Sequence, residues 1–319
     1  MHALFTADQT LIRETADKIA AGGLHRARLA ARGQAVTDDP FDELVEGWSG
    51  LGVSEGAGGH GGSLVDVALL IYALARQCDP SGYVAHAAAV QACIGAGVDL
   101  PTAAGEGERL ALLSADPKEA APGVRRATRA AVLTAEGVSL HALASVDPYD
   151  GMDTARAWGV ARLGDFLAGG GSADLAEARA LSVAAADLCG TAQGTIEVAV
   201  DYASQRHQFG KPIGSYQAIG HRLAQAKGDL EAAWSLTLYA CWAAGSAPAE
   251  ALGAALAAKA MAGDVAVFAS ESCIQTHGGM GITIEADPHL YLKRALTTDA
   301  WIANGSVCRR RLAALALEG

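Results

Sequence analysis

The stretch at residues 206–220, RHQFGKPIGSYQAIG, indicates how this chain is organised. It separates two long Ala- and Leu-rich segments with helical periodicity, and a Phe-Gly pair, a proline and further glycines interrupt that periodicity. We therefore expect an irregular connection between two helices. Its Arg206 can clamp a pyrophosphate through two parallel hydrogen bonds, and its Phe209 can stack on a flat ring. From spacing alone, the stretch is either a site for an anionic, partly aromatic group or a polar loop with one incidental arginine.

A second motif separates these alternatives. The pattern R-x-Q-F-G-x-P-I-x-x-x-Q-A-I at 206–219 resembles a signature of the flavin-dependent acyl-CoA dehydrogenases, and QTHGGMG at 275–281 resembles that family's Q-x-x-GG-x-G. The FTADQ at 5–9 is also similar to the start of the family's first helix. In that family both signatures contact the FAD of a neighbouring subunit. The resemblance therefore implies FAD-binding roles for Arg206, Gln208, Phe209, Ile213, Tyr216, Gln217, Ile219, Gln275, Gly278 and Gly279.

Composition limits the class of protein. The 319 residues are 51% apolar and 18% charged, which is typical of a compact globular protein with a large core. The net charge of −11, without a block of Lys or Arg, argues against nucleic acid or an anionic membrane as a partner. Six scattered cysteines without a C-x-x-C pair predict buried thiols in a reducing compartment, not a metal site or a disulfide framework. With no signal-peptide pattern, we expect a cytoplasmic protein.

Periodicity and turn residues predict a mainly α fold with a small β insert. Residues 1–99 are expected to form an N-terminal helical domain, residues 100–166 a reduced middle β-domain, and residues 167–319 a C-terminal domain of the four-helix-bundle type. This is the arrangement that the resemblance implies. The Gly-rich stretch at 50–62 is either a phosphate cradle or, as the resemblance suggests, a loop after the second helix.

The middle segment departs from the family pattern. The family's T-E-P-x-x-G-S-D is reduced to LSADP at 113–117, and the W/Y-I-T-N strand that hydrogen-bonds the flavin has no clear counterpart. We therefore expect a shortened sheet in which the elements that cover this chain's own flavin are degraded.

The catalytic base of the family is also missing. That base is a Glu in a Y-E-G-T turn, and it removes the proton alpha to an acyl thioester. One alignment puts Trp301 and Ile302 at the Tyr and Glu, another puts Asn304 at the Glu, and the position that some members use on an earlier helix falls near Ala180. We therefore assign no catalytic residue. The nearest carboxylates are those of Glu177 and Asp299.

The chain keeps the motifs that contact a neighbour's FAD, but the residues that would serve its own flavin and substrate are missing or degraded. This combination resembles the short subunit of heteromeric acyl-CoA dehydrogenases from bacterial steroid degradation. The resemblance implies a longer acyl-CoA dehydrogenase homologue as partner in a heterotetramer, an acyl-CoA substrate such as a steroid side-chain CoA ester, and an electron-transfer acceptor protein. Two alternatives stay open. The chain could be an active homo-oligomeric flavoenzyme with an unidentified base, or a non-catalytic structural or regulatory subunit.

Overall fold

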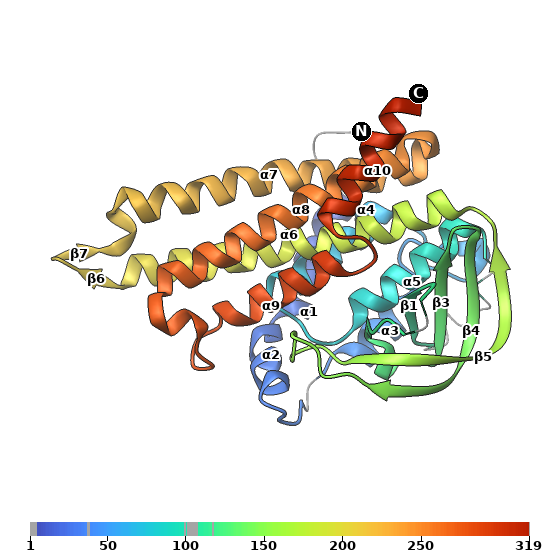
Figure 1. Ribbon diagram of the computed structural model, residues 1–319, viewed down its shortest axis with the longest axis horizontal. Coiled ribbons are helices and arrows are strands. Elements are labelled where there is room, and N and C mark those ends of the chain that lie inside the picture. Colours follow the sequence, from blue (N-terminus) through green and yellow to red (C-terminus); the bar gives the residue numbers. More distant parts are fainter. Residues whose placement is uncertain (1–4, 37–38, 99, 101–107, 117, 319) are drawn as a thin grey trace.

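The computed structural model describes residues 5–36, 39–98, 100, 108–116 and 118–318. A small sheet lies at one end of a long helical bundle, and the N-terminal helices lie between that sheet and the middle of the bundle, as Figure 1 shows. This confirms the predicted fold class, mainly α with a small β insert.

The N-terminal part is helical. Its elements are α1 (Ala7–Ala20), α2 (Gly23–Ala31), α3 (Phe41–Trp48), η1 (Glu55–Ala57), α4 (Leu64–Arg76) and α5 (Tyr83–Ala96). Thr6 begins α1 through a capping box, in which its hydroxyl accepts from the Gln9 N–H at 3.2 Å and its own N–H donates to the Gln9 side chain at 3.1 Å. The sequence analysis missed α2, because the Gly22-Gly23 pair interrupts the periodicity that would have predicted it. Gly22 has φ of +81°, and this left-handed residue turns the chain directly into α2.

The middle part is one small sheet. Its elements are β1 (Leu110–Ser114), β2 (Ala121–Pro122), η3 (Val124–Arg126), β3 (Arg129–Thr134), β4 (Gly137–Pro148) and β5 (Trp158–Gly170). The strand order is β1-β3-β4-β5-β2, with β1 parallel to β3 and the other pairs antiparallel. The last strand therefore runs to Gly170, past the position 166 at which the sequence analysis ended this domain. Register shifts in the long β4–β5 ladder accompany the bend seen in Figure 1.

The C-terminal part is the bundle. Its elements are α6 (Ala173–Gln205), β6 (His207–Gln208), β7 (Lys211–Pro212), η4 (Ile213–Ser215), α7 (Gln217–Ser246), α8 (Pro248–His277), η5 (Gly278–Ile282), α9 (Pro288–Ala300) and α10 (Gly305–Glu318). The α8 helix with η5 is long and apolar enough to cross a membrane, but 61% of its most apolar window is buried inside the protein. The apolar composition of α8 is therefore explained by its packing against α6, α7, α9 and α10.

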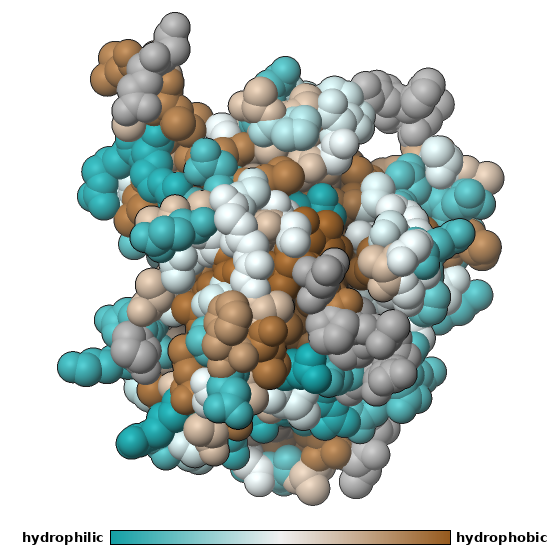
Figure 2. Space-filling view, turned by 90° about the vertical axis from the view of Figure 1, so that its right-hand side faces the viewer, coloured by the Kyte–Doolittle hydropathy of each residue, from teal (hydrophilic) through white to brown (hydrophobic). Residues whose placement is uncertain are grey.

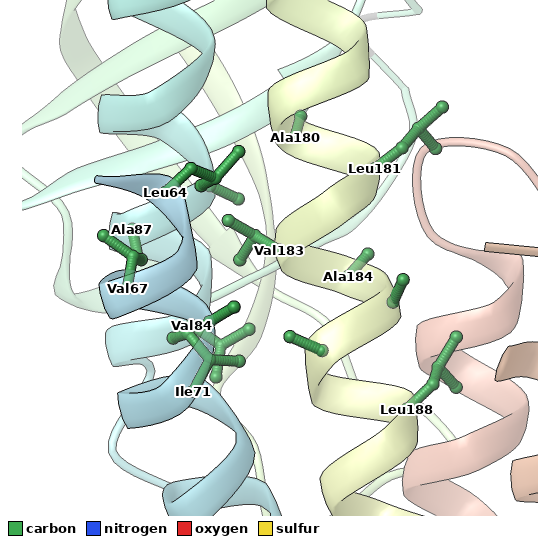
Figure 3. Packing of buried hydrophobic residues seen from close by; sticks show 14 of the residues in the cluster. Leu64, Val67, Ile71, Val84, Ala87, Ala180, Leu181, Val183, Ala184 and Leu188 are labelled. Atoms are coloured by element: carbon green, nitrogen blue, oxygen red, sulfur yellow. The ribbon is translucent and has the colours of Figure 1, made fainter. Parts of the chain in front are cut away.

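Helix α6 packs against both the N-terminal helices and the bundle. Leu64 and Ile71 of α4 lie against the small side chains of α6, as Figure 3 shows. Two glycines of α6 permit this close approach, since an added Cβ at Gly190 would lie 2.3 Å from the Tyr72 carbonyl and one at Gly194 would lie 2.1 Å from the Arg76 carbonyl. Small residues thus let backbones meet where bulkier side chains would push the helices apart.

A buried ionic network ties α6 to its surroundings. Arg294 of α9 donates to Asp187 Oδ1 of α6 from Nε at 3.1 Å and from Nη2 at 2.5 Å. Arg156, from the loop before β5, lies 3.6 Å from Asp187 Oδ2, and Thr298 donates to the same oxygen at 2.8 Å. Burial alone would raise the pKa of Asp187, but the two arginines outweigh it and hold that pKa below its ordinary value. The carboxylate is therefore an anion in the folded protein.

All six cysteines are free and buried, as the sequence analysis expected. Among the described residues, no group of three or more His, Cys, Asp or Glu side chains is arranged to hold a metal ion.

Removal of this carboxylate should destabilise the protein strongly. Asp187→Asn keeps the shape of the side chain but leaves the buried guanidinium of Arg294 without its counter-ion, which typically costs about 3–5 kcal/mol, whereas Arg156 keeps its ion pair with Asp153. Urea unfolding measures the loss. Asp201→Asn, an exposed carboxylate on the same helix, is the matched control and should change the free energy of unfolding by less than about 0.5 kcal/mol. Equal effects of the two substitutions would contradict the structural role of the network.

His86 of α5 is a second buried titratable group. It is 1% exposed, and its Nδ1 accepts from the Leu110 N–H at 3.0 Å, which joins α5 to the first strand of the sheet. Its Nε2 has no hydrogen-bond partner in the part of the chain that the structure describes. Burial lowers the pKa of His86 to about 4 from its ordinary value of 6.5, so the ring is neutral at physiological pH.

This pKa predicts a loss of stability in mild acid. Below pH 6.5 the unfolded chain binds a proton at His86 that the folded chain does not bind until the pH approaches 4, so the fall in pH stabilises the unfolded state relative to the folded one. Between pH 7.5 and pH 5 this residue should account for about 2 kcal/mol of lost stability. In His86→Gln, whose carbonyl can still accept from Leu110, urea unfolding at the two pH values should show a loss smaller by that amount. An unchanged pH dependence would show that the ring is already protonated in the folded state.

Candidate functional site

The first predicted segment forms a hairpin at the end of the bundle. Strands β6 and β7 pair through His207–Pro212 and Gln208–Lys211, and Phe209-Gly210 makes the turn, with φ of +52° and +81°. Figure 1 shows this hairpin projecting beyond the ends of α6 and α7. Phe209 at its tip is 94% exposed. An aromatic side chain held in a strained turn and left in water is typical of a contact surface.

The predicted residues divide into a supporting and an exposed group. Ile213 is buried in a small cluster with Ala203 and Cys273, and the half-buried Ile219 packs against it. Tyr216, also half-buried, donates from its hydroxyl to the Gln208 carbonyl at 3.0 Å. These side chains fix the shape of the hairpin.

The polar members of the segment point outward. Arg206, Gln208 and Gln217 are all exposed. No carboxylate of the described chain lies within ion-pair distance of Arg206. The hairpin therefore presents an unpaired cation and amide groups to the solvent.

The second predicted segment lies at the same end of the bundle. The ring of His277 stacks on Tyr202, near the end of α6, with the centroids 4.0 Å apart and the planes at 21°. Gly278 and Gly279 are exposed, and an added Cβ on either would meet no atom within 4 Å. Gly278 also has φ of +63°, a conformation that favours glycine. The structure thus brings both motifs together at one end, with bare backbone beside the cationic hairpin.

This group of residues fits the diphosphate of FAD. Arg206 offers an exposed guanidinium that pairs with no carboxylate of the described residues, and Gln208 and Gln275 offer exposed amides. Charge-assisted bonds from arginine to phosphate are among the strongest hydrogen bonds available to a protein. The open glycines leave room for a ligand against the backbone. We call residues 206–219 and 275–279 together the diphosphate surface.

One of the positions expected for the base, Ile302, lies elsewhere, at a cavity of about 330 Å³. The ends of β1 and β3 form one wall, and Glu177 of α6, Trp301, Ile302 and Arg311 of α10 form the other. Trp301 and Ile302, which one alignment places at the Tyr and Glu of Y-E-G-T, both line this cavity. Pro117, the last residue of the reduced LSADP motif, is outside the described residues.

None of the alternative base positions supplies a free carboxylate. Ala180 is fully buried in the apolar core between α4, α5 and α6, as Figure 3 shows. Asn304 is exposed, and its side-chain oxygen accepts from the Val307 N–H at 2.9 Å as an N-cap of α10. Ile302 has φ of +70°, an uncommon conformation for a β-branched residue.

The two carboxylates nearest to these positions are both engaged. Glu177 lines the cavity, but Arg311 binds both of its oxygens, with Nη2 2.5 Å from Oε2. This contact with Glu177 raises the pKa of Arg311. The Asp299 carboxylate accepts from the Gly305 N–H at 3.2 Å and lies 3.5 Å from the ammonium of the fully buried Lys259. Lys259 also donates to the Asp299 and Ala303 carbonyls at 2.8 and 3.0 Å. These hydrogen bonds fix the segment between α9 and α10, and Asp299 is part of that structure.

The cavity does not fit the flavin ring of FAD. Its walls are largely apolar, and its polar side chains are bonded to one another, Glu177 to Arg311 and Ser114 to Glu119. A ring with polar edges would find few free partners there. Sequence analysis missed the role of Arg311, because Arg311 and Glu177 are far apart in the chain and no local pattern links them.

The two sites are far apart on one helix. Glu177 and Arg206 lie roughly 30 positions apart along α6, which at about 1.5 Å per residue separates them by on the order of 40 Å. That distance exceeds the length of an extended FAD molecule. One cofactor cannot contact both the cavity and the diphosphate surface of the same chain.

Comparison with known proteins identifies relatives of the N-terminal and C-terminal parts of the chain. The family model of the acyl-CoA dehydrogenase C-terminal domain matches residues 172–315, and that of the N-terminal domain matches residues 6–99. The acyl-CoA dehydrogenase IpdE2 of Mycobacterium tuberculosis is 32% identical over 308 residues, covering 90% of this chain and 91% of that protein.

Solved structures share the fold. The Tcur3481-Tcur3483 steroid ACAD G363A variant superposes with a TM-score of 0.85 at 22% identity, covering 98% of each chain. A chain of the ChsE4-ChsE5 complex from Mycobacterium tuberculosis gives a TM-score of 0.84 at 18% identity, and the match covers 100% of this chain and 100% of that chain.

The diphosphate surface predicts a specific effect of one substitution. Arg206→Ala in the assembled protein should weaken FAD binding by about 10- to 100-fold, the factor expected for loss of a charge-assisted hydrogen bond. The FAD affinity of each variant can be measured from the fluorescence of the released FAD. Arg162→Ala removes an exposed arginine of the sheet, whose side chain is 74% exposed, and should leave FAD affinity unchanged. Equal affinity in the two variants would show that Arg206 does not touch the cofactor.

Proposed function

This chain belongs to the acyl-CoA dehydrogenase family, whose cofactor is FAD, and we propose that it is a subunit of a heteromeric enzyme that binds FAD in trans while a partner chain supplies the catalytic glutamate. The reaction is α,β-dehydrogenation of an acyl-CoA thioester.

One observation carries the proposal. The chain presents an exposed, unpaired Arg206 beside open glycines, and on the order of 40 Å away its own cavity has Trp301 and Ile302 where a base is needed. Residues suited to FAD and residues suited to the chemistry would therefore belong to different chains. This arrangement supports a role in trans better than a self-sufficient active site.

In such an enzyme, residues of this chain would bind and orient the FAD. When bound, FAD accepts the hydride that leaves the β carbon of the substrate. Arg206 neutralises diphosphate charge, Gln208 and Gln275 donate hydrogen bonds, and the exposed ring of Phe209 offers a stacking surface. The side chains of Ile213 and Tyr216 orient these groups by holding the hairpin.

Exposed apolar surface supports the need for a partner. Leu163, Phe166 and Leu167 on β5 are 38–64% exposed, and Leu315 and Leu317 on α10 are 40% and 88% exposed. Figure 2 shows hydrophobic residues gathered near the centre of the face at the sheet end of the molecule. Apolar surface of this kind is characteristic of protein interfaces.

Substrate and partners follow from the relatives as proposals. One structural neighbour is described as a steroid ACAD and another is a complex of two different chains. We propose a steroid side-chain CoA ester as the substrate, a longer acyl-CoA dehydrogenase homologue as the partner, and an electron-transfer acceptor protein as the oxidant of the reduced flavin.

The test is co-purification with a longer homologue that carries Y-E-G-T. We expect about one FAD per pair of unlike chains, and dehydrogenation of acyl-CoA only by the pair. The lone chain should be slower by about 10²- to 10⁴-fold or more, because it lacks a positioned base.

Two controls separate the alternatives. Glu177→Gln should leave the activity of the pair unchanged, and Glu→Gln in the partner's Y-E-G-T should abolish it. Activity of the lone chain that Glu177→Gln removes would establish a homo-oligomeric enzyme instead. A pair that contains no flavin would establish a non-catalytic subunit.

A further inference from the structure

A second and larger cavity lies on the other side of α6. Its volume is about 1140 Å³, and its walls come from the loop before α4, the start of α4, the end of α5 and the second half of α7. Arg179 of α6 lines it, whereas Glu177 lines the smaller cavity. Two positions along a helix correspond to a rotation of about 200°, so the two side chains leave nearly opposite faces. The two cavities are therefore separate.

Arg179 is a buried cation whose hydrogen-bond partner in the described part of the chain is a neutral amide. It is 8% exposed, and its Nε donates to Gln91 Oε1 at 3.1 Å, while Nη2 donates to the same oxygen. No carboxylate in the described ranges pairs with it. Burial lowers the pKa of Arg179 to about 10, which still leaves the side chain charged at neutral pH.

The other buried arginines differ in this respect. Arg26 pairs with Asp79, Arg156 with Asp153, and Arg294 with Asp187, each through a contact of 2.5–2.7 Å. A buried charge without a partner is costly, and proteins normally pair such charges. The neutral Gln91 occupies the Nε edge of Arg179 and leaves Nη1 without a hydrogen-bond partner from the described residues. This unpaired group lies at the wall of the cavity.

The lining changes from apolar to polar toward the solvent. Leu64 and Val98 are buried, and Leu238 and Trp242 are half-buried. The hydroxyl residues at the rim, such as Ser246, are exposed. Among the described residues that line the cavity, Arg179 is the only one that is an Arg, Lys, Asp, Glu or His. A ligand here would meet one positive charge at depth and apolar walls around it.

We propose that this cavity binds an apolar molecule with one carboxylate, which pairs with Arg179. A carboxylate matches the planar guanidinium with two parallel hydrogen bonds, and one negative charge balances one positive charge. A phosphate dianion would bring excess charge into an apolar site. The volume suits a fused-ring or long-chain acid. The site goes beyond the proposed function, because it needs neither FAD nor the partner's glutamate.

Two sources could present such a carboxylate. One is a free apolar acid, and the other is the carboxylate end of an acyl-CoA formed from a dicarboxylic acid. Both would place the same group on Arg179. Comparing free dodecanedioate with dodecanedioyl-CoA and dodecanoyl-CoA distinguishes them, because only the thioester source adds affinity through the CoA moiety.

The test uses 1-pyrenebutyrate as a fluorescent probe and 1-pyrenebutanol as its neutral match, with the full chain and with the assembled complex. We expect the acid to bind one to one, and Arg179→Gln to weaken its binding by about 10- to 100-fold. Arg179→Lys should retain part of the affinity because it keeps the charge. The alcohol should bind more weakly and should not respond to either substitution. Arg162→Gln on the sheet surface is the control, with no change expected.

Stability gives an independent readout. Removal of an unpaired buried charge should leave the melting temperature of Arg179→Gln unchanged or higher without ligand, and pyrenebutyrate should raise the melting temperature of the unmodified chain more than that of the variant. Equal affinities for acid and alcohol would overturn the proposal. So would binding that occurs in the lone chain but is lost in the complex, since a partner's carboxylate would then be the natural counter-ion. Arg179→Met provides a second neutral variant if the glutamine variant fails to fold.

Discussion

The contact between Asp187 and Arg294 fixes how the helices and the sheet of this molecule are placed relative to one another. Asp187 lies near the middle of α6, and Arg294 brings α9 against it and also donates to the Asp79 carbonyl at 2.7 Å. Asp79 in turn pairs with Arg26 of α2. A buried carboxylate shared by these elements is stable only when every partner is in place, because any missing guanidinium leaves an uncompensated charge. The network therefore specifies how the N-terminal helices, the sheet and the bundle meet.

With its middle fixed in this way, α6 can carry different sites at its two ends. One end faces the small cavity with Glu177 and, on the opposite side, the large cavity with Arg179. The other end leads into the exposed hairpin with Arg206 and Phe209. Because the ends are on the order of 40 Å apart, loss of the chemistry at one end does not disturb the surface at the other. This separation supports the proposed role, in which the chain serves a cofactor while a neighbour supplies the base.

Much of the fold could be predicted from local patterns, and several features could not. The helix at Phe41–Trp48 and the ends of the long helices follow from caps, glycines and prolines, which act within a few residues. Helix α2 was missed because the Gly22-Gly23 pair interrupts the local periodicity, and the buried ion pair that supports the helix involves the distant Asp79. At the site, the two motifs identified the segments that the structure brings together at one end of the bundle, and their contact with FAD stays a prediction. The engagement of Glu177 by Arg311 and the uncompensated charge of Arg179 depend on tertiary contacts that no short pattern contains.

The most direct test of the proposed division of labour is an experimental structure of the assembled complex with FAD bound. The account predicts that the Arg206 guanidinium lies within about 3 Å of a diphosphate oxygen, the range of a charge-assisted bond, and that the flavin ring of the same FAD molecule lies in the partner chain beside its glutamate. A flavin ring in this chain's own cavity, against Trp301 and Ile302, would contradict it.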